Sequence, residues 1–165
     1  MGLAVTALEF DVLVAHLGIE PVPLVLRVPS PGRTEGERAH LARQAWSGLT
    51  TRGLGGPYSL DPTLSRLLDL LRGPDRELDG RLWTDGPLRV LAAATGDDAV
   101  LVVKTEHWLT FHPADASGLA RHALSVLPQR DPGPGQSVTL PTADFEAATT
   151  APTFAEGLRT RGIRH

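Results

Sequence analysis

The pattern of apolar and polar residues between Asp75 and His112 predicts a β-sheet. Four short runs there are rich in β-branched, leucine or aromatic residues: RELDGRLWT, LRVLAAAT, AVLVVKTE and HWLTFH. Asp-Gly-Pro and Gly-Asp-Asp, both typical of turns, separate the first three runs. Because consecutive strands joined by tight turns pair antiparallel, we predict a four-stranded meander over about residues 75–112.

Helical periodicity in the residues before this sheet predicts helices that can cover one of its faces. Two T-x-x-E capping boxes, at Thr6–Glu9 and Thr34–Glu37, each precede a run with apolar residues at helical spacing. The first run predicts a helix over Ala7–Leu17, and the second predicts a helix that ends at about Thr51. The inner strands of the meander are apolar on both sides, so both faces need cover, and the fold class is α+β.

Two further helices are predicted on either side of the sheet. Asp61-Pro62 is a helix start, and the leucines that follow it are helically spaced until Gly73-Pro74 stops the helix. After the meander, a fourth helix is predicted to begin at Pro113. Its inward residues are expected to be Leu119, Ala123, Leu124 and Leu127.

Weaker patterns lie outside these elements. Glu20–Arg27 contains two prolines and is compatible with a short edge strand, and Ser137–Leu140 is compatible with a short strand. Thr142–Thr150 indicates a weak helix, and a third capping box at Thr153–Glu156 precedes a last one. We expect one domain over residues 1–165.

Composition restricts the function classes. With 165 residues and 41% hydrophobic residues, the chain is long enough to bury a core. The net charge of -3 argues against a nucleic-acid partner, and the lack of cysteine excludes disulfides and thiolate chemistry. Acidic residues at Glu9 and Asp11 are unlike a signal peptide, and no apolar run reaches the roughly 20 residues of a membrane span. We therefore expect a cytoplasmic protein without membrane insertion.

The histidines do not form a catalytic or metal-binding pattern. His107 and His112 lie five apart on one predicted strand, which places them on opposite faces of the sheet. His16, His40 and His122 fall on three separate predicted helices without a ligand at helical spacing. We expect no metal and no cofactor.

Carboxylates on the first strand are the other candidates for chemistry. Glu77 and Asp79 share a face with Arg81, which favours a solvated charge network over an acid–base pair. No nucleophile elbow or phosphate-binding loop is present. The chain is expected not to be an enzyme, and a small-molecule enzyme that uses Glu77 or Asp79 as base is kept as an alternative.

The sheet faces are more informative than the polar residues. Trp83 and Trp108 are either core residues or anchors of a protein interface, and the sequence leaves both interpretations open. Arginine and tryptophan are favoured at interfaces, and several lie on the mixed face or beside turns, among them the Asp85-Gly86-Pro87 turn. The predicted protein-binding residues are Arg81, Trp83, Arg89, Lys104 and Trp108.

Four blocks of sequence together carry a family resemblance. TALEFDVLVAHLG, VPSPGRTEGER, PDRELDGRLW and PGPGQSVTLPTADF resemble the EspG family of type VII (ESX) secretion-associated chaperones. They keep the family's order and extend from Thr6 to Phe145. The resemblance implies a central antiparallel sheet flanked by helical bundles, in two halves related by a pseudo-two-fold axis. It also implies that this chain corresponds to about the N-terminal half of the family's usual length.

The resemblance further implies a cytosolic, non-enzymatic protein that binds the PPE tip of a PE–PPE heterodimer. Such a protein keeps its client soluble and delivers it for secretion. The pseudo-symmetry suggests the hypothesis that two copies form a homodimer through a sheet surface or edge, each replacing the other's missing half. A purely structural dimerisation module without a client is a further alternative.

Overall fold

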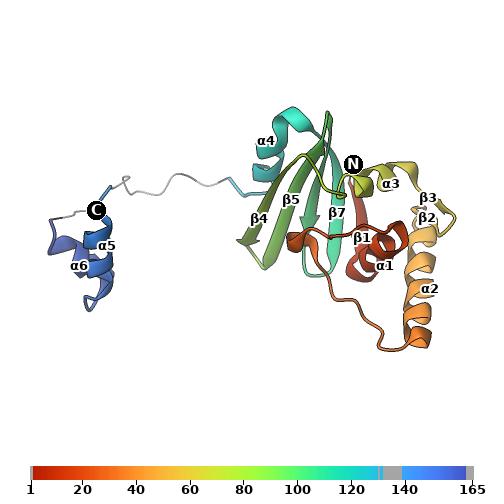
Figure 1. The fold of residues 1–165 in the computed structure, drawn as a ribbon, viewed down its shortest axis with the longest axis horizontal. Coiled ribbons are helices and arrows are strands. Elements are labelled where there is room, and N and C mark those ends of the chain that lie inside the picture. The colour runs from red at the N-terminus through yellow and green to blue at the C-terminus, as the bar shows by residue number, and fades with distance from the viewer. Residues whose placement is uncertain (1, 130, 132–138, 163–165) are drawn as a thin grey trace. The chain divides into compact units, whose positions relative to one another are not determined.

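The predicted meander forms the larger part of a five-stranded antiparallel sheet, shown in Figure 1. A fifth strand, β1, pairs antiparallel with β7, and the spatial order is β1-β7-β6-β5-β4. The prediction of an α+β fold with a four-stranded meander is therefore confirmed. The strands are β1 (Leu3–Thr6), β4 (Arg76–Trp83), β5 (Pro87–Thr95), β6 (Asp98–Lys104) and β7 (Trp108–Asp115).

This computed structural model describes residues 2–129, 131 and 139–162. The chain divides into two compact units, Met1–Pro128 and Gln129–His165. The sheet lies entirely in the first unit, and the second contains a pair of short helices.

Strand β1 is the one strand of the five-stranded sheet that the sequence pattern did not reveal. It is only four residues long and continues directly into the first helix. No turn links β1 to its partner, because its register with Trp108–Phe111 joins segments that are distant in the chain. Val5 of β1 lies opposite Leu109, and both side chains are fully buried. A local pattern cannot disclose a pairing of this kind.

One face of the sheet, called here the α1 face, carries the main core. Helices α1 and α3 and the 3-10 helix η1 contact this face, and α2 packs on α1. The alternating residues Leu91, Val102 and Phe111 point into this core from successive strands. The elements of this layer are α1 (Ala7–Leu17), η1 (Leu24–Leu26), α2 (Glu35–Thr51), β2 (Gly55–Gly56), β3 (Ser59–Leu60) and α3 (Pro62–Asp69).

The opposite face, called the α4 face, has a smaller cover. The 3-10 helix η2 (Ala116–Gly118) and helix α4 (Leu119–Leu124) follow β7 and turn back over the sheet. Ala123 and Leu119 of α4 pack on a small cluster around Val90 and Leu101. Both faces of the sheet are thus covered by the chain's own helices, but unequally.

The predicted start of the fourth helix at Pro113 is wrong. Strand β7 continues to Asp115, and Pro113 pairs with Val100 of β6. Because β1 begins at Leu3, opposite Phe111, no described residue of β1 pairs with Pro113 on its other side, so no β1 partner there needs the N–H that proline lacks. The helix is consequently short, and its predicted inward residues Leu124 and Leu127 are 61% and 39% exposed.

The predicted edge strand over Glu20–Arg27 is also wrong. The segment forms the single 3-10 turn η1, in which the Leu26 N–H donates to the Pro23 carbonyl at 2.9 Å. Pro21 and Pro23 lack the N–H groups that a ladder needs, which favours a turn over a strand. Val25 and Leu26 are nevertheless buried against the core.

The caps are predicted well. Both halves of the capping box are present at Thr6–Glu9 and at Thr34–Glu37. At Thr153 the side chain accepts from the Glu156 N–H, which is the N-cap half of the third box. These contacts depend only on residues within one helical turn, so the sequence pattern is sufficient to find them.

The second unit contains α5 (Thr142–Thr149) and α6 (Phe154–Arg159). A Cβ added at Gly157 would lie 2.6 Å from the Ala148 carbonyl oxygen, so the two helices touch through their backbones there. Phe145 and Phe154 stack edge to face with centroids 5.3 Å apart. Of the predicted strand Ser137–Leu140, Ser137 and Val138 lie outside the described residues.

Candidate protein-binding site

Three of the predicted interface residues form a row across the sheet. Arg81 of β4 lies opposite Arg89 of β5, and Arg89 lies opposite Lys104 of β6. Directly opposite residues of an antiparallel pair share a face, so these three cations lie side by side on the α1 face. We call Arg81, Arg89 and Lys104 the basic row.

The basic row is poorly neutralised within the chain. Arg81 forms an ion pair with Asp79 at 3.7 Å. Across the described parts of the chain, neither Arg89 nor Lys104 has a carboxylate at ion-pair distance. The Lys104 ammonium donates instead to the Arg27 carbonyl oxygen. Burial, and then the charge of Arg89, lower the pKa of Lys104. Like charges directly opposite one another destabilise a sheet, so this row is costly to the isolated chain.

Trp83 lies two residues beyond Arg81 on β4, on the same face as the basic row. It lies opposite Pro87, on the α1 face, next to the turn between β4 and β5. Its side chain is 78% exposed, which excludes the interpretation of Trp83 as a core residue. The turn itself is closed by a hydrogen bond of 3.1 Å from the Thr84 N–H to the Gly86 carbonyl. An exposed tryptophan thus lies beside a row of cations.

Trp108 lies apart from the other four residues. It pairs with Thr6 at the start of β7, one residue out of phase with Leu109, and so lies on the α4 face. Its ring is 43% exposed and faces the guanidinium of Arg52, whose carbon lies 5.4 Å from the ring centroid. The structure therefore brings Arg81, Trp83, Arg89 and Lys104 together and separates Trp108 from them.

The carboxylates of β4 are exposed and sit on the same face as the basic row. Asp79 is engaged with Arg81, as the charge-network interpretation expects. Glu77 is exposed beside it, opposite the small side chain of Ala93.

The histidines are spread over the fold. His16, His40 and His122 lie on α1, α2 and α4, and His112 lies on β7, while His107 precedes that strand. His122 Nε2 is 2.7 Å from the Asp115 carboxylate, which also accepts from the Ser117 hydroxyl at 2.6 Å. In the described ranges no three metal-ligating side chains gather in a way that could hold an ion, nor is any helix long and apolar enough to cross a membrane.

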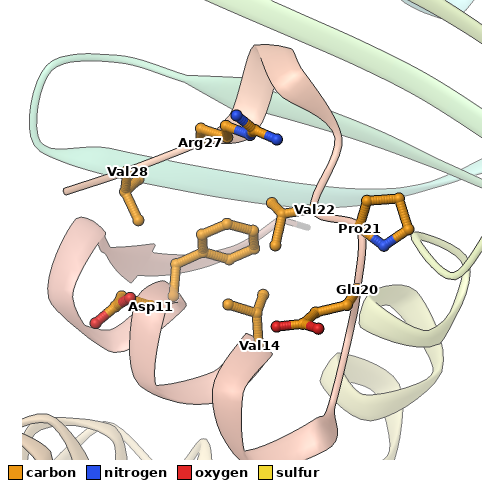
Figure 2. A pocket seen from close by; sticks show the side chains of 8 residues that line it. Asp11, Val14, Glu20, Pro21, Val22, Arg27 and Val28 are labelled. Atoms are coloured by element: carbon orange, nitrogen blue, oxygen red, sulfur yellow. The ribbon is translucent and has the colours of Figure 1, made fainter. Parts of the chain in front are cut away.

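The sequence did not predict the hollow whose lining side chains are shown in Figure 2. It has a volume of about 600 Å³ and lies between α1 and the segment Glu20–Val28. Arg27 lines the hollow and also accepts from Lys104 through its carbonyl oxygen, so the hollow adjoins the row. Its apolar side chains are Phe10, Val14, Val22 and Val28, and its charged ones are Asp11, Glu20 and Arg27.

Comparisons with known proteins agree on one relationship. The model of the EspG family matches residues 6–165. Among solved structures, the fold is similar to that of the Mycobacterium tuberculosis type VII secretion system chaperone EspG5, determined in complex with a PE25–PPE41 dimer. The two chains are 18% identical with a TM-score of 0.67, over 99% of this chain and 68% of the other. No curated protein sequence matches the chain.

Proposed function

The chain belongs to the EspG family, and we propose that it is a cytoplasmic, non-enzymatic chaperone of a type VII secretion system. In this proposal it binds a PE–PPE heterodimer through the tip of the PPE subunit. The bound heterodimer stays soluble because its apolar, aggregation-prone tip is covered until secretion.

The observation that carries this proposal is the match of the EspG family model to residues 6–165. It is supported by the likeness in fold to EspG5, whose structure contains a PE25–PPE41 dimer. The match extends through nearly the whole described sheet and both units, so the proposal does not depend on one short motif.

The surface proposed for the client is the basic row with Trp83 and the neighbouring hollow. Trp83 offers a large apolar side chain that a partner can bury, and buried tryptophans are frequent anchors of interfaces. Arg89 and Lys104 lack carboxylates of their own among the described residues, so an acidic or carbonyl-rich client segment has unpaired cations to meet. Val22 and Val28 of the hollow can receive an apolar side chain of the same segment.

Titration of a PE–PPE heterodimer encoded beside a type VII system of the same genome tests the proposal. The wild-type chain is expected to bind, and Trp83→Ala to bind at least about tenfold more weakly. Tyr58→Ala is the matched control, since Tyr58 is a fully exposed aromatic residue remote from the row in sequence and is expected to leave affinity within about twofold. A wild-type chain that binds no such heterodimer contradicts the proposed function; binding that Trp83→Ala leaves unchanged contradicts only the proposed surface.

We also propose that copies of this chain associate with one another through the sheet. The sheet edge at β4 favours this association, because within the described ranges β4 has a strand neighbour on one side only.

A further inference from the structure

Strand β4 is the open edge of the five-stranded sheet. It is eight residues long and contains no proline, and among the residues that the structure describes it pairs only with β5. Its outward backbone N–H and C=O groups therefore form a template for another strand. The opposite edge is less available, because β1 has four residues and its Ala4 carbonyl accepts from Arg52 at 3.1 Å.

The residues of β4 are arranged symmetrically about Gly80. Asp79 and Arg81 flank it at one residue, and Leu78 and Leu82 flank it at two. We propose that two copies of this chain pair antiparallel through β4, with the two-fold axis at Gly80. This joins the two five-stranded sheets into one continuous sheet and gives an isologous interface.

In this register the two opposed pairs next to the axis are complementary. Asp79 of each copy lies opposite Arg81 of the other, on the α1 face, where both side chains are nearly half exposed. Leu78 of each copy lies opposite Leu82 of the other, on the α4 face, where Leu78 is 39% exposed. Opposed ion pairs and apolar pairs both stabilise a strand pairing.

Neighbouring symmetric registers are disfavoured by charge. An axis at Leu78 places Glu77 opposite Asp79, an axis at Asp79 opposes two aspartates, and an axis at Arg81 opposes two arginines. Like charges directly opposite one another are destabilising, so the charges select the axis at Gly80.

The α4 face offers additional apolar surface for the same partner. Helix α4 contacts β4 on that face, and Leu124 and Leu127 beside it are 61% and 39% exposed. A two-fold axis perpendicular to the sheet brings both copies of α4 to the same face of the joined sheet. The same register also places Trp83 opposite Glu77, so self-pairing and client binding share the end of β4 and exclude one another there.

A charge exchange tests the pairing. Sedimentation of the intact wild-type chain is expected to show a monomer–dimer equilibrium. In Arg81→Asp, the new carboxylate of each copy lies opposite Asp79 of the other copy. This variant is expected to dimerise at least about tenfold more weakly than the wild type. The double variant Asp79→Arg with Arg81→Asp is expected to restore dimerisation, whereas the exposed control Arg43→Asp on α2 leaves it unchanged. A wild-type chain that stays monomeric at every concentration, or a double variant as weak as the single one, overturns the proposal.

A cysteine at the axis gives a second readout that needs no charge change. The chain has no cysteine, and a Cβ at Gly80 would meet only the Val90 Cβ at 3.8 Å, so Gly80→Cys is expected to fold. Two such residues face each other across the axis at a spacing that suits a disulfide. Mild oxidation is expected to give covalent dimers of Gly80→Cys and not of Ser47→Cys on exposed α2. Equal yields from both variants overturn the proposed axis.

Discussion

At one edge of the sheet, β1 is four residues long and continues directly into α1, on which α2 packs. At the other edge, β4 exposes most of its eight residues. Both edges carry carboxylates and arginines, so composition does not distinguish them. The difference lies in what those side chains contact.

At the β1 edge the charges are engaged within the chain. Glu9 is 5% exposed, and its carboxylate accepts from the Thr6 N–H at 2.7 Å and from Arg52 at 2.5 Å. Arg52 also donates to the Ala4 carbonyl and lies over Trp108. Asp11, 7% exposed, is paired with Arg38 of α2. These pairs join α1 to Arg38 and Arg52, and Arg52 also occupies the Ala4 carbonyl of the edge strand.

At the β4 edge the charges are left open. Arg81 and Asp79 form an exposed pair at 3.7 Å, and Trp83 is 78% exposed. Exposed pairs of this kind contribute little to folding. The β1 edge is therefore built for stability, whereas the residues of the β4 edge are available to a partner.

The largest effect is expected from the core next to the β1 edge. Phe111 of β7 is fully buried against Phe10, with ring centroids 6.1 Å apart. Phe111→Ala is expected to lower the free energy of unfolding by about 3–5 kcal/mol, because it removes buried apolar contacts and leaves a cavity. Trp83→Ala at the β4 edge is expected to change it by less than about 0.5 kcal/mol. Urea unfolding followed by circular dichroism measures both, and equal losses would contradict the contrast.

Breaking the charges of the two edges is expected to give the next largest difference. Arg52→Ala leaves the buried Glu9 carboxylate without its cation and is expected to cost about 2–4 kcal/mol of unfolding free energy. Arg81→Ala removes an exposed partner and is expected to cost less than about 0.5 kcal/mol. The same urea titration compares the two variants, and an Arg81 variant as unstable as the Arg52 variant would show that β4 is not an open edge.

Substitutions in the basic row are expected to change the affinity for a partner rather than the stability of the fold. Arg89→Ala is expected to weaken binding of a PE–PPE heterodimer by about tenfold and to leave folding intact, since it relieves repulsion with Lys104. Arg43→Ala on exposed α2 is the control and is expected to change affinity less than about twofold. Calorimetric titration measures both, and equal losses would indicate general electrostatic attraction instead of a defined row.

The smallest effect is expected from the contact between Asp115, at the end of β7, and His122 of α4, and it depends on pH. The Ser117 hydroxyl, and then His122, hold the pKa of Asp115 well below its ordinary value near 3.8. Because the pKa of Asp115 is lower in the folded state than in the unfolded state, its carboxylate stabilises the fold. This stabilisation is complete well above the ordinary value near 3.8 and decreases as the pH falls below that value toward the folded-state pKa. Asp115→Asn is therefore expected to melt slightly lower than the wild type at about pH 7, and by a smaller margin at about pH 3. Thermal melts at both values provide the measurement, and a gap that widens on acidification would contradict the assigned cause.

The sequence predicted what depends on neighbouring residues. The meander, both complete capping boxes and the shared face of Asp79 and Arg81 all follow from spacing along the chain. It failed where distant segments decide the outcome. Strand β1 needs β7 to form, Pro113 is tolerated because the pairing of β1 with β7 begins only at Phe111, and Leu124 is exposed because α4 is short.

The candidate site divides in the same way. Arg81, Arg89 and Lys104 form a row only because of the register between three strands. The predicted strand boundaries fixed that register only in part. The exposure of Trp83 depends on the absence of a covering element over that end of β4, and the sequence left it undecided. The hollow beside α1 depends on the path of the proline-containing segment around Val22 and Val28, which has no local pattern.

Hydrogen–deuterium exchange of the intact chain, with and without a PE–PPE heterodimer, tests most directly the claim that partners bind at the β4 edge. We predict slower exchange on binding in residues 76–91, around the turn between β4 and β5. We predict no change in residues 35–52, which form α2 and its C-cap and line neither the basic row nor the hollow. Protection concentrated in α2, with β4 unchanged in the bound state, would contradict the proposed surface.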